Sequence, residues 1–328
     1  MVRLVAVLGH TLLAGLLTWF AAADSFAQTF PTKPVKLIAG HAPGGLSDRL
    51  ARLIGPKLAE LWSQPVLVEN RAGAAGTISA AQVAKAPADG YTLLICSSTN
   101  LAFAAVVKKD VGYDPMRDFS MIGRIASVPT VLAVGSWVPA SSIPELVNYA
   151  RAHPGRLTSG SSGKGSSSGF ALELLKAAAG IDILEVPYGG LGPAVLGVLS
   201  GQIDMVFADL SLVRPHVASG AMRIIAGVGS RRYAAAPGMP TIQEQGLDGV
   251  AVDSWLGLVA PARLPPEITA KLTGALTQVL HMPDVRQQLI ELGYEPMDDT
   301  PDLFAAAVRA DIEKYSIIAR RLGITVAD

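Results

Sequence analysis

The segment VKLIAGHAPGGLSD occupies residues 35–48, and it decides the fold class of this chain. It begins with five residues typical of a buried strand and ends in a glycine-containing loop. Leucines then recur at helical spacing from Leu46 to Leu61, which predicts an amphipathic helix over residues 47–62. Gly55-Pro56 should break or kink this helix, because proline lacks the amide hydrogen that continues it. Strand, loop and helix in this order predict a parallel α/β sheet.

The same alternation of strand and helix continues along the chain and is then repeated. In the first set, further strands are expected at 64–69 and 91–96, with a helix at 77–86. The second set comprises strands at 156–159, 183–186, 203–207 and 223–227 and helices at 169–179 and 192–200. Both sets share one order of elements, so the sequence predicts two α/β lobes with parallel-rich sheets flanked by helices.

Two apolar segments, Thr130–Val134 and Trp255–Ala260, are each followed by a proline-containing turn and a helix start. We interpret them as two crossover strands that join the lobes. The first lobe would comprise residues 28–130 plus 251–328, and the second lobe residues 131–250. Two linking strands make a hinge, and ligands of such sheets bind at the carboxyl ends of strands that face the cleft.

The composition excludes several classes of function. Positive and negative side chains balance at 27 each, which leaves no basic field to hold nucleic acid or an anionic membrane. The single cysteine, Cys96, rules out an intramolecular disulfide. The five histidines are scattered without ligand spacing, so we expect no metal site and no cofactor.

The N-terminus has the pattern of a secretory signal peptide. Arg3 precedes a mostly apolar run, and the small residues Ser25 and Ala27 suit a cleavage site after Ala27. We therefore expect residues 1–27 to be removed during export, leaving a soluble periplasmic protein. The alternative is a membrane anchor, for which the run is marginally long enough.

Four polar or glycine-rich loops follow predicted strands and would face the cleft: residues 40–48, 97–100, 160–169 and 187–190. Glycine lets the backbone approach a ligand, and free amides at a helix N-terminus favour an anion. Such loops can also be simple tight turns. Asp48 can be read as a helix-terminal charge and Tyr188 as core or cleft wall. Asp209, just past a strand, could meet an amine or hydroxyl of a ligand.

Two enzyme motifs need to be weighed in the third loop. The segment around Lys164 resembles a phosphate-binding loop but lacks its first glycine and its Ser/Thr after the lysine. Residues 165–169 match G-x-S-x-G, which leaves an exported serine hydrolase using Ser167 as an alternative function. Only His216 and His281 follow it, and neither has a recognisable catalytic context.

An ordered set of motifs spans the chain after residue 29: FPTKPV (30–35), APGG with Asp48 (42–48), QPV with VENR (64–71), ADGYTLL (88–94), VPY (186–188), GQID (201–204) and PTI (240–242). In these motifs the chain resembles the Bug family, the periplasmic solute receptors of tripartite tricarboxylate transporters. The resemblance implies a hinged, two-lobed periplasmic-binding-protein fold of type II character. It also implies a small organic carboxylate as ligand and integral membrane transporter subunits as partners.

The resemblance also implies which residues contact the ligand. First-lobe contacts would fall, through loop amides, hydroxyls and water, to Ala42, Pro43, Gly44, Gly45, Ser47 and Asp48. Independently of the resemblance, the predicted cleft-facing loop after residue 96 adds Ser98 and Thr99 as candidate contacts. Second-lobe contacts would fall to Ser162, Gly163, Gly165 and Ser166, with Asp209 as a candidate selectivity residue, and the predicted loop at 187–190 adds Tyr188 as a further candidate.

The chain departs from the family pattern at three positions. Gly169 replaces a frequent histidine, Gly189 replaces a lysine, and His41 replaces an apolar or aromatic residue. The two glycines lack the polar side chains that would contact the far end of a ligand, so the sequence favours an aromatic or aliphatic monoacid. We expect a monomer that binds without chemistry. A signalling receptor of the same fold, read by a sensor kinase ectodomain, is the third alternative.

Overall fold

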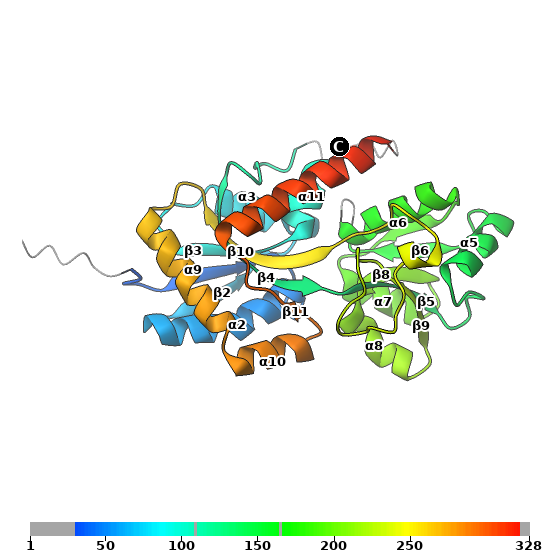
Figure 1. The fold of residues 1–328 in the computed structure, drawn as a ribbon, viewed down its shortest axis with the longest axis horizontal. Coiled ribbons are helices and arrows are strands. Elements are labelled where there is room, and N and C mark those ends of the chain that lie inside the picture. The colour runs from blue at the N-terminus through cyan, green and yellow to red at the C-terminus, as the bar shows by residue number, and fades with distance from the viewer. Residues whose placement is uncertain (1–29, 108–109, 164–165, 322–328) are drawn as a thin grey trace, which may run out of the picture. The chain divides into compact units, whose positions relative to one another are not determined.

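The computed structural model describes residues 30–107, 110–163 and 166–321. From Lys33 onward the chain folds into one compact unit, which contains two β-sheets flanked by helices (Figure 1). The predicted signal peptide and its cleavage site lie outside the described residues. Among the helices that are described, none is both long enough and apolar enough to cross a membrane.

The first sheet combines strands from both ends of the chain. They are β1 Val35–Ala39, β2 Val66–Asn70, β3 Thr92–Ser97, β4 Phe119–Val128, β10 Ser254–Pro261 and β11 Glu295–Pro296. Their order across the sheet is β11-β4-β10-β3-β1-β2. Strands β1, β2 and β3 are parallel, whereas β10 runs antiparallel between β3 and β4. Leu37, Ile38 and Ala39 of β1 are buried, as expected for a strand covered on both faces.

The second sheet repeats this arrangement. Its strands are β5 Thr130–Gly135, β6 Thr158–Ser161, β7 Leu184–Pro187, β8 Met205–Asp209 and β9 Met222–Gly227. Their order is β7-β6-β8-β5-β9, with β6, β7 and β8 parallel and β5 antiparallel to its neighbours. Counted from β2 in the first sheet and from β7 in the second, the fourth strand is β10 or β5, and each runs antiparallel to its neighbours. The predicted α/β fold with two repeated lobes is confirmed.

Helices cover both sheets. Those that contact the first sheet are α2 Leu46–Trp62, α3 Thr77–Ala84, α9 Pro266–Leu280, α10 Pro283–Glu291 and α11 Pro301–Arg321. Those of the second sheet are α5 Ile143–Ala152, α6 Ser167–Ala179, α7 Leu191–Leu199 and α8 Leu210–Ala218. Shorter helical segments are η1 Ala74–Gly76, η2 Thr99–Phe103, α4 Ala104–Val107 and η3 Gln243–Gln245.

The predicted break at Gly55-Pro56 is wrong, because α2 continues through both residues to Trp62. Its buried face, which includes Leu50, Ile54 and Leu58, packs on the sheet and outweighs the one hydrogen bond that proline removes. Gly55 is buried against the sheet, where a Cβ atom would make ordinary contacts at 3.6 Å with the side chains of Val66 and Val68.

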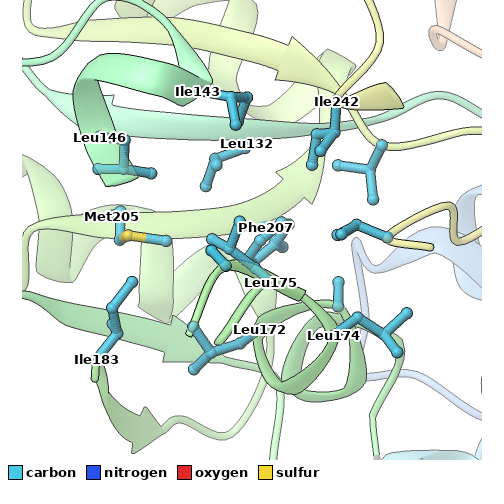
Figure 2. Packing of buried hydrophobic residues seen from close by; sticks show 14 of the residues in the cluster. Leu132, Ile143, Leu146, Leu172, Leu174, Leu175, Ile183, Met205, Phe207 and Ile242 are labelled. Atoms are coloured by element: carbon cyan, nitrogen blue, oxygen red, sulfur yellow. The ribbon is translucent and has the colours of Figure 1, made fainter. Parts of the chain in front are cut away.

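The core of the second sheet lies between the sheet and helices α5 and α6. Figure 2 shows Leu132 and Phe207 from adjacent strands facing Leu172 and Leu175 of α6. All four side chains are fully buried. Each stabilises the fold by about 1.5–3 kcal/mol through burial of apolar surface. This core fixes the second-sheet loops that are candidates for ligand binding.

Two links join the sheets, and each directly precedes one of the segments predicted as a crossover strand. Strand β4 ends at Val128 in the first sheet and β5 begins at Thr130 in the second, with Pro129 between them. The chain returns between Gly227 of β9 and Ser254 of β10. Sheet membership supports lobe boundaries near residues 130 and 251, which remain a prediction.

An aromatic cluster on three elements packs between the two sheets. The ring centroids of Phe103 and Phe170 lie 5.4 Å apart, and both rings contact Tyr315 of α11. The backbone amide of Asp253, beside the return link, donates to the Tyr315 hydroxyl at 3.2 Å. Helix α11 therefore contacts residues of both predicted lobes through Tyr315.

Candidate functional site

The loop between β1 and α2 presents backbone amides at a helix N-terminus. Ala42, Pro43 and Gly44 are exposed, and the Gly45 amide donates to the Ala42 carbonyl at 2.9 Å to close a turn. Gly45 is the N-cap of α2 and makes no side-chain capping bond, so the amides of the first turn stay open to an anion. A Cβ atom at Gly45 would lie 2.9 Å from the Ala42 oxygen, too close for any larger residue.

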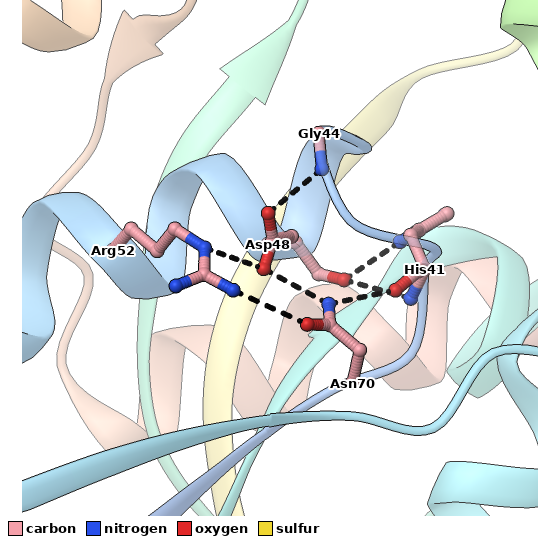
Figure 3. Close-up of polar contacts among 6 residues, drawn as sticks. His41, Gly44, Asp48, Arg52 and Asn70 are labelled. Atoms are coloured by element: carbon pink, nitrogen blue, oxygen red, sulfur yellow. Dashed lines mark hydrogen bonds and ion pairs between the residues drawn. The ribbon is translucent and has the colours of Figure 1, made fainter.

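Asp48 holds this loop in place, as Figure 3 shows. Its Oδ2 accepts from the Gly44 amide at 2.8 Å, and its Oδ1 accepts from Arg52 Nε and Asn70 Nδ2, both at 2.9 Å. Desolvation alone would raise the pKa of Asp48, but these hydrogen bonds outweigh it and the pKa is lowered. Asp48 is buried and fully engaged, so the structure gives it a positioning role.

Ser47 and His41 form a second support for the same loop. The Ser47 hydroxyl accepts from the His41 amide at 3.0 Å and lies 2.8 Å from Nδ1 of the His41 ring. Asn70 also donates to the His41 carbonyl at 3.0 Å. Burial lowers the pKa of His41 to about 4, so the ring is neutral at neutral pH. Anion binding by this loop would therefore rest on its backbone amides.

The neighbouring loop follows β3 and touches the second sheet. Ser98 is buried, and Thr99 Oγ1 donates to Ser167 Oγ of α6 at 3.2 Å. Asn100, which the sequence reasoning did not single out, accepts from the Ser97 amide at 2.8 Å. Its side-chain amide donates to the Gly76 carbonyl at 3.4 Å and so ties two loops of the first sheet together.

The turn at residues 74–76 was missed as part of this site. Ala74, Ala75 and Gly76 have successive positive φ angles of 48°, 59° and 85°. Left-handed alanines are strained, and such strain persists where the surrounding structure over-determines the backbone. A Cβ at Gly40 would lie 3.4 Å from Gly76 Cα, so this turn lies beside the first loop. The glycine pair at 73 and 76 was the available sequence signal.

The loop between β6 and α6 is largely satisfied by its own hydroxyls. Ser166 is fully buried and caps α6 by accepting from the Gly169 amide at 3.2 Å. Ser168 accepts from the Ser162 amide at 3.0 Å, and Ser161 accepts from the Gly163 amide at 3.3 Å. Ligand contacts by this loop remain a prediction, and the predicted contact Gly165 lies outside the described residues.

Neighbouring side chains surround both Gly169, one of the departures from the family pattern, and Tyr188. A Cβ at Gly169 would lie 2.8 Å from Glu185 Oε1, so the glutamate fills the space that a larger side chain would need. The Tyr188 ring lies over Gly197 of α7, where a Cβ would be 2.8 Å from its Cζ. Tyr188 thus packs at the edge of the second-sheet core, which agrees with its reading as core.

Asp209, Ser211 and Arg49 form a different kind of group. Asp209 Oδ2, Ser211 Oγ and Arg49 Nε are buried, and none has a hydrogen-bond partner among the described residues. A buried polar group without a partner costs about 1–3 kcal/mol. Burial raises the pKa of Asp209 to about 7, while the nearby Arg49 charge acts to lower it. This group is poised to receive polar atoms.

In the described part of the chain, the side-chain hydrogen bond found for Ser167 is with Thr99 and not with a histidine or a carboxylate. The Ser167 hydroxyl accepts this bond. Three histidine rings have other partners: His41 contacts Ser47, His153 contacts Tyr149, and His281 contacts Thr277 and Asp298. The described residues also contain no cluster of three or more His, Cys, Asp or Glu side chains able to hold a metal ion.

Two repeated α/β sheets with facing loops define a two-lobed solute-binding fold. A family model for the tripartite tricarboxylate transporter family receptor matches residues 50–324, and the chain belongs to that family. The predicted relationship is thus confirmed. The chain is 31% identical over 325 residues to protein BugT of Bordetella pertussis, covering 98% of both chains.

Solved structures agree with this assignment. The structure of Rpa4515 from R. palustris with adipate is 34% identical to this chain with a TM-score of 0.84, covering 90% of this chain and 98% of that one. MatC from Rhodopseudomonas palustris with bound malate is 31% identical with a TM-score of 0.81, covering 88% and 99%.

Proposed function

We propose that this protein is an exported receptor that captures a small organic carboxylate between its two lobes and delivers it to a tripartite membrane transporter. The observation that carries the proposal is the uncapped N-terminus of α2, presented by a loop that Asp48 and Asn70 hold in place. Open helix amides stabilise a carboxylate without a cationic side chain. Relatives that hold adipate and malate support this ligand class.

A thermal-shift panel tests the proposal. The protein is unfolded and refolded to remove any retained ligand, then heated with di- and tricarboxylates, aromatic acids and aliphatic monoacids. A true ligand at one hundred times its Kd adds about 2.7 kcal/mol to stability and raises Tm. A panel in which no acid changes Tm contradicts the proposal. Neutral amides of the same acids serve as the matched control and should leave Tm unchanged.

Export and delivery complete the proposed function. We propose cleavage after Ala27, which intact-mass measurement of periplasmic protein checks directly. The receptor would act as a monomer and bind the integral transporter subunits. Pull-down with and without ligand separates delivery to a transporter from contact with a sensor kinase ectodomain. Catalysis forms no part of the proposal, since Ser167 is engaged with Thr99 rather than with a base.

A further inference from the structure

The unpartnered polar group lies where the two sheets meet. Asp209 is the last residue of β8 and pairs in register with Thr130, the first residue of β5. The next amide, that of Leu210, donates to the Pro129 carbonyl at 2.8 Å, directly at the link between the sheets. Arg49 comes from α2, which covers the first sheet. The group therefore draws its members from both lobes beside the hinge.

The surroundings hold these side chains close together. The backbone at Gly293, with φ +81°, lies so near Ser211 that a Cβ there would be 2.7 Å from the serine Cβ. The Arg49 guanidinium carbon lies 5.8 Å from the ring centroid of Tyr294. The Tyr294 hydroxyl is itself engaged with the Leu46 carbonyl at 3.3 Å. Packing thus fixes the position of Arg49 and Ser211 while Arg49 Nε and Ser211 Oγ remain without hydrogen-bond partners.

Unpartnered atoms concentrate here. Within the described residues, five buried side-chain atoms lack hydrogen-bond partners, and three of them belong to Arg49, Asp209 and Ser211. Arg49 Nε offers a donor, Asp209 Oδ2 an acceptor, and the Ser211 hydroxyl can act as either. Asp209 is only 4% exposed, so water has little access to its carboxylate.

The charges select the chemical class of the missing partner. A second carboxylate would face the negative charge of Asp209, and an ammonium would face the positive charge of Arg49. Buried charges repel strongly because the surroundings are poorly polarisable. A hydroxyl carries no net charge, accepts from Arg49 and donates to Asp209. It therefore satisfies both residues without repulsion, and Ser211 can supply a third hydrogen bond.

We infer that Arg49, Asp209 and Ser211 form a subsite for a hydroxyl group of the bound acid, so that the receptor prefers hydroxycarboxylates to their deoxy counterparts. The inference rests on the proposed carboxylate-binding function. The hydroxyl bridges a helix of the first sheet and a strand of the second, so it also favours the closed arrangement. This ligand differs from the plain aromatic or aliphatic monoacid that Gly169 and Gly189 suggest.

Isothermal titration of the refolded wild-type protein with matched acids tests the subsite. The pairs are malate and succinate, lactate and propionate, and citrate and propane-1,2,3-tricarboxylate. Aspartate, which has an ammonium in place of the malate hydroxyl, is titrated as well. In each pair that binds, the hydroxy acid should bind about tenfold more tightly or better, as expected for hydrogen bonds to charged groups. Aspartate should bind more weakly than malate.

Isosteric variants test the same residues. Asp209→Leu and Arg49→Met should each reduce the preference within a pair to threefold or less. The control variants Asp284→Leu and Arg117→Met change exposed ion pairs elsewhere and should keep it. If Asp209→Leu does not fold, the wild-type pairs and Arg49→Met still decide the matter.

The outcomes separate the two proposals. Equal wild-type affinities for hydroxy and deoxy acids overturn the subsite and leave carboxylate binding intact. Tighter binding of aspartate than malate also overturns it, because an ammonium would then occupy the group. A preference that survives in both variants overturns the assignment to these residues. Failure of every acid to bind instead contradicts the proposed function.

Discussion

The loop before α2 and the end of β8 are two polar regions built in opposite ways. In the first, Asp48, Asn70, Ser47 and His41 all bond to one another or to the loop backbone, so their polar side chains are consumed. In the second, Asp209 and Ser211 carry buried atoms without partners among the described residues. The contrast indicates that one lobe offers a rigid backbone cradle, while the other offers side chains that still lack partners.

The largest expected effect is on the rigid cradle. Asp48→Ala removes three hydrogen bonds from a buried carboxylate and should destabilise the protein by about 2–4 kcal/mol. Carboxylate affinity should fall as well, because the loop would no longer hold its amides in place. Urea unfolding and titration measure both effects. Asp284→Ala, which breaks an exposed ion pair with Lys57, should cost less than about 1 kcal/mol. Equal losses in the two variants would contradict the positioning role.

A pH-dependent effect is expected for Asp209, whose folded pKa of about 7 lies above its usual 3.8. The folded state binds this proton more tightly, so the stabilisation is complete below pH 3.8 and is lost as pH rises towards 7. Asp209→Asn removes this pH-dependent loss. The stability of the variant relative to wild type should therefore be roughly 2–4 kcal/mol more favourable at pH 8 than at pH 5. Urea unfolding at both pH values checks this. A variant effect that is the same at both would show that the carboxyl titrates normally.

His41 should show the opposite dependence. Its folded pKa of about 4 lies below the usual 6.5, so the unfolded chain binds this proton more tightly. The contribution is complete above pH 6.5 and is lost as pH falls towards 4, by roughly 3 kcal/mol in total. His41→Asn should remove this loss. Titration of the His41 ring by NMR gives an independent control, and a pKa near 6.5 would rule the prediction out.

The smallest effect is expected at a third contact, where Thr99, after β3, donates a hydrogen bond to Ser167 at the start of α6. Ser167→Ala removes one partly buried hydrogen bond and should weaken ligand binding by about 0.5–1.5 kcal/mol. Ester turnover should be absent before and after the change. Ser200→Ala, which removes a local bond to Gly197, is the control and should leave affinity unchanged. Ester hydrolysis that disappears in Ser167→Ala would instead support the hydrolase.

The sequence predicts the fold well because strand and helix periodicity are local signals. The predicted helix break at Pro56 is wrong for a non-local reason, because packing of Leu50, Ile54 and Leu58 outweighs one lost hydrogen bond. The first loop is found from its glycines and its helix start. The positioning role of Asp48 is less visible, because Asn70, one of its partners, comes from the next strand.

The second region was only partly predictable. Asp209 follows a strand and could be named, but Arg49 could not, since only the folded chain brings α2 near the end of β8. Likewise, Ser166 has the residue type of a ligand contact but serves as a helix cap. Composition locates polar loops, whereas hydrogen-bond partners decide which side chains in them remain available.

A crystal structure of the protein with its best-binding acid tests the contrast most directly. We predict that the Asp48 hydrogen bonds to Gly44 and Asn70 persist unchanged and that the ligand carboxylate meets the amides at the start of α2. A ligand hydroxyl should lie within hydrogen-bond distance of Asp209 Oδ2 and Arg49 Nε. An Asp48 side chain that leaves its partners to bind the acid, with Asp209 and Arg49 still unpartnered, would contradict the account.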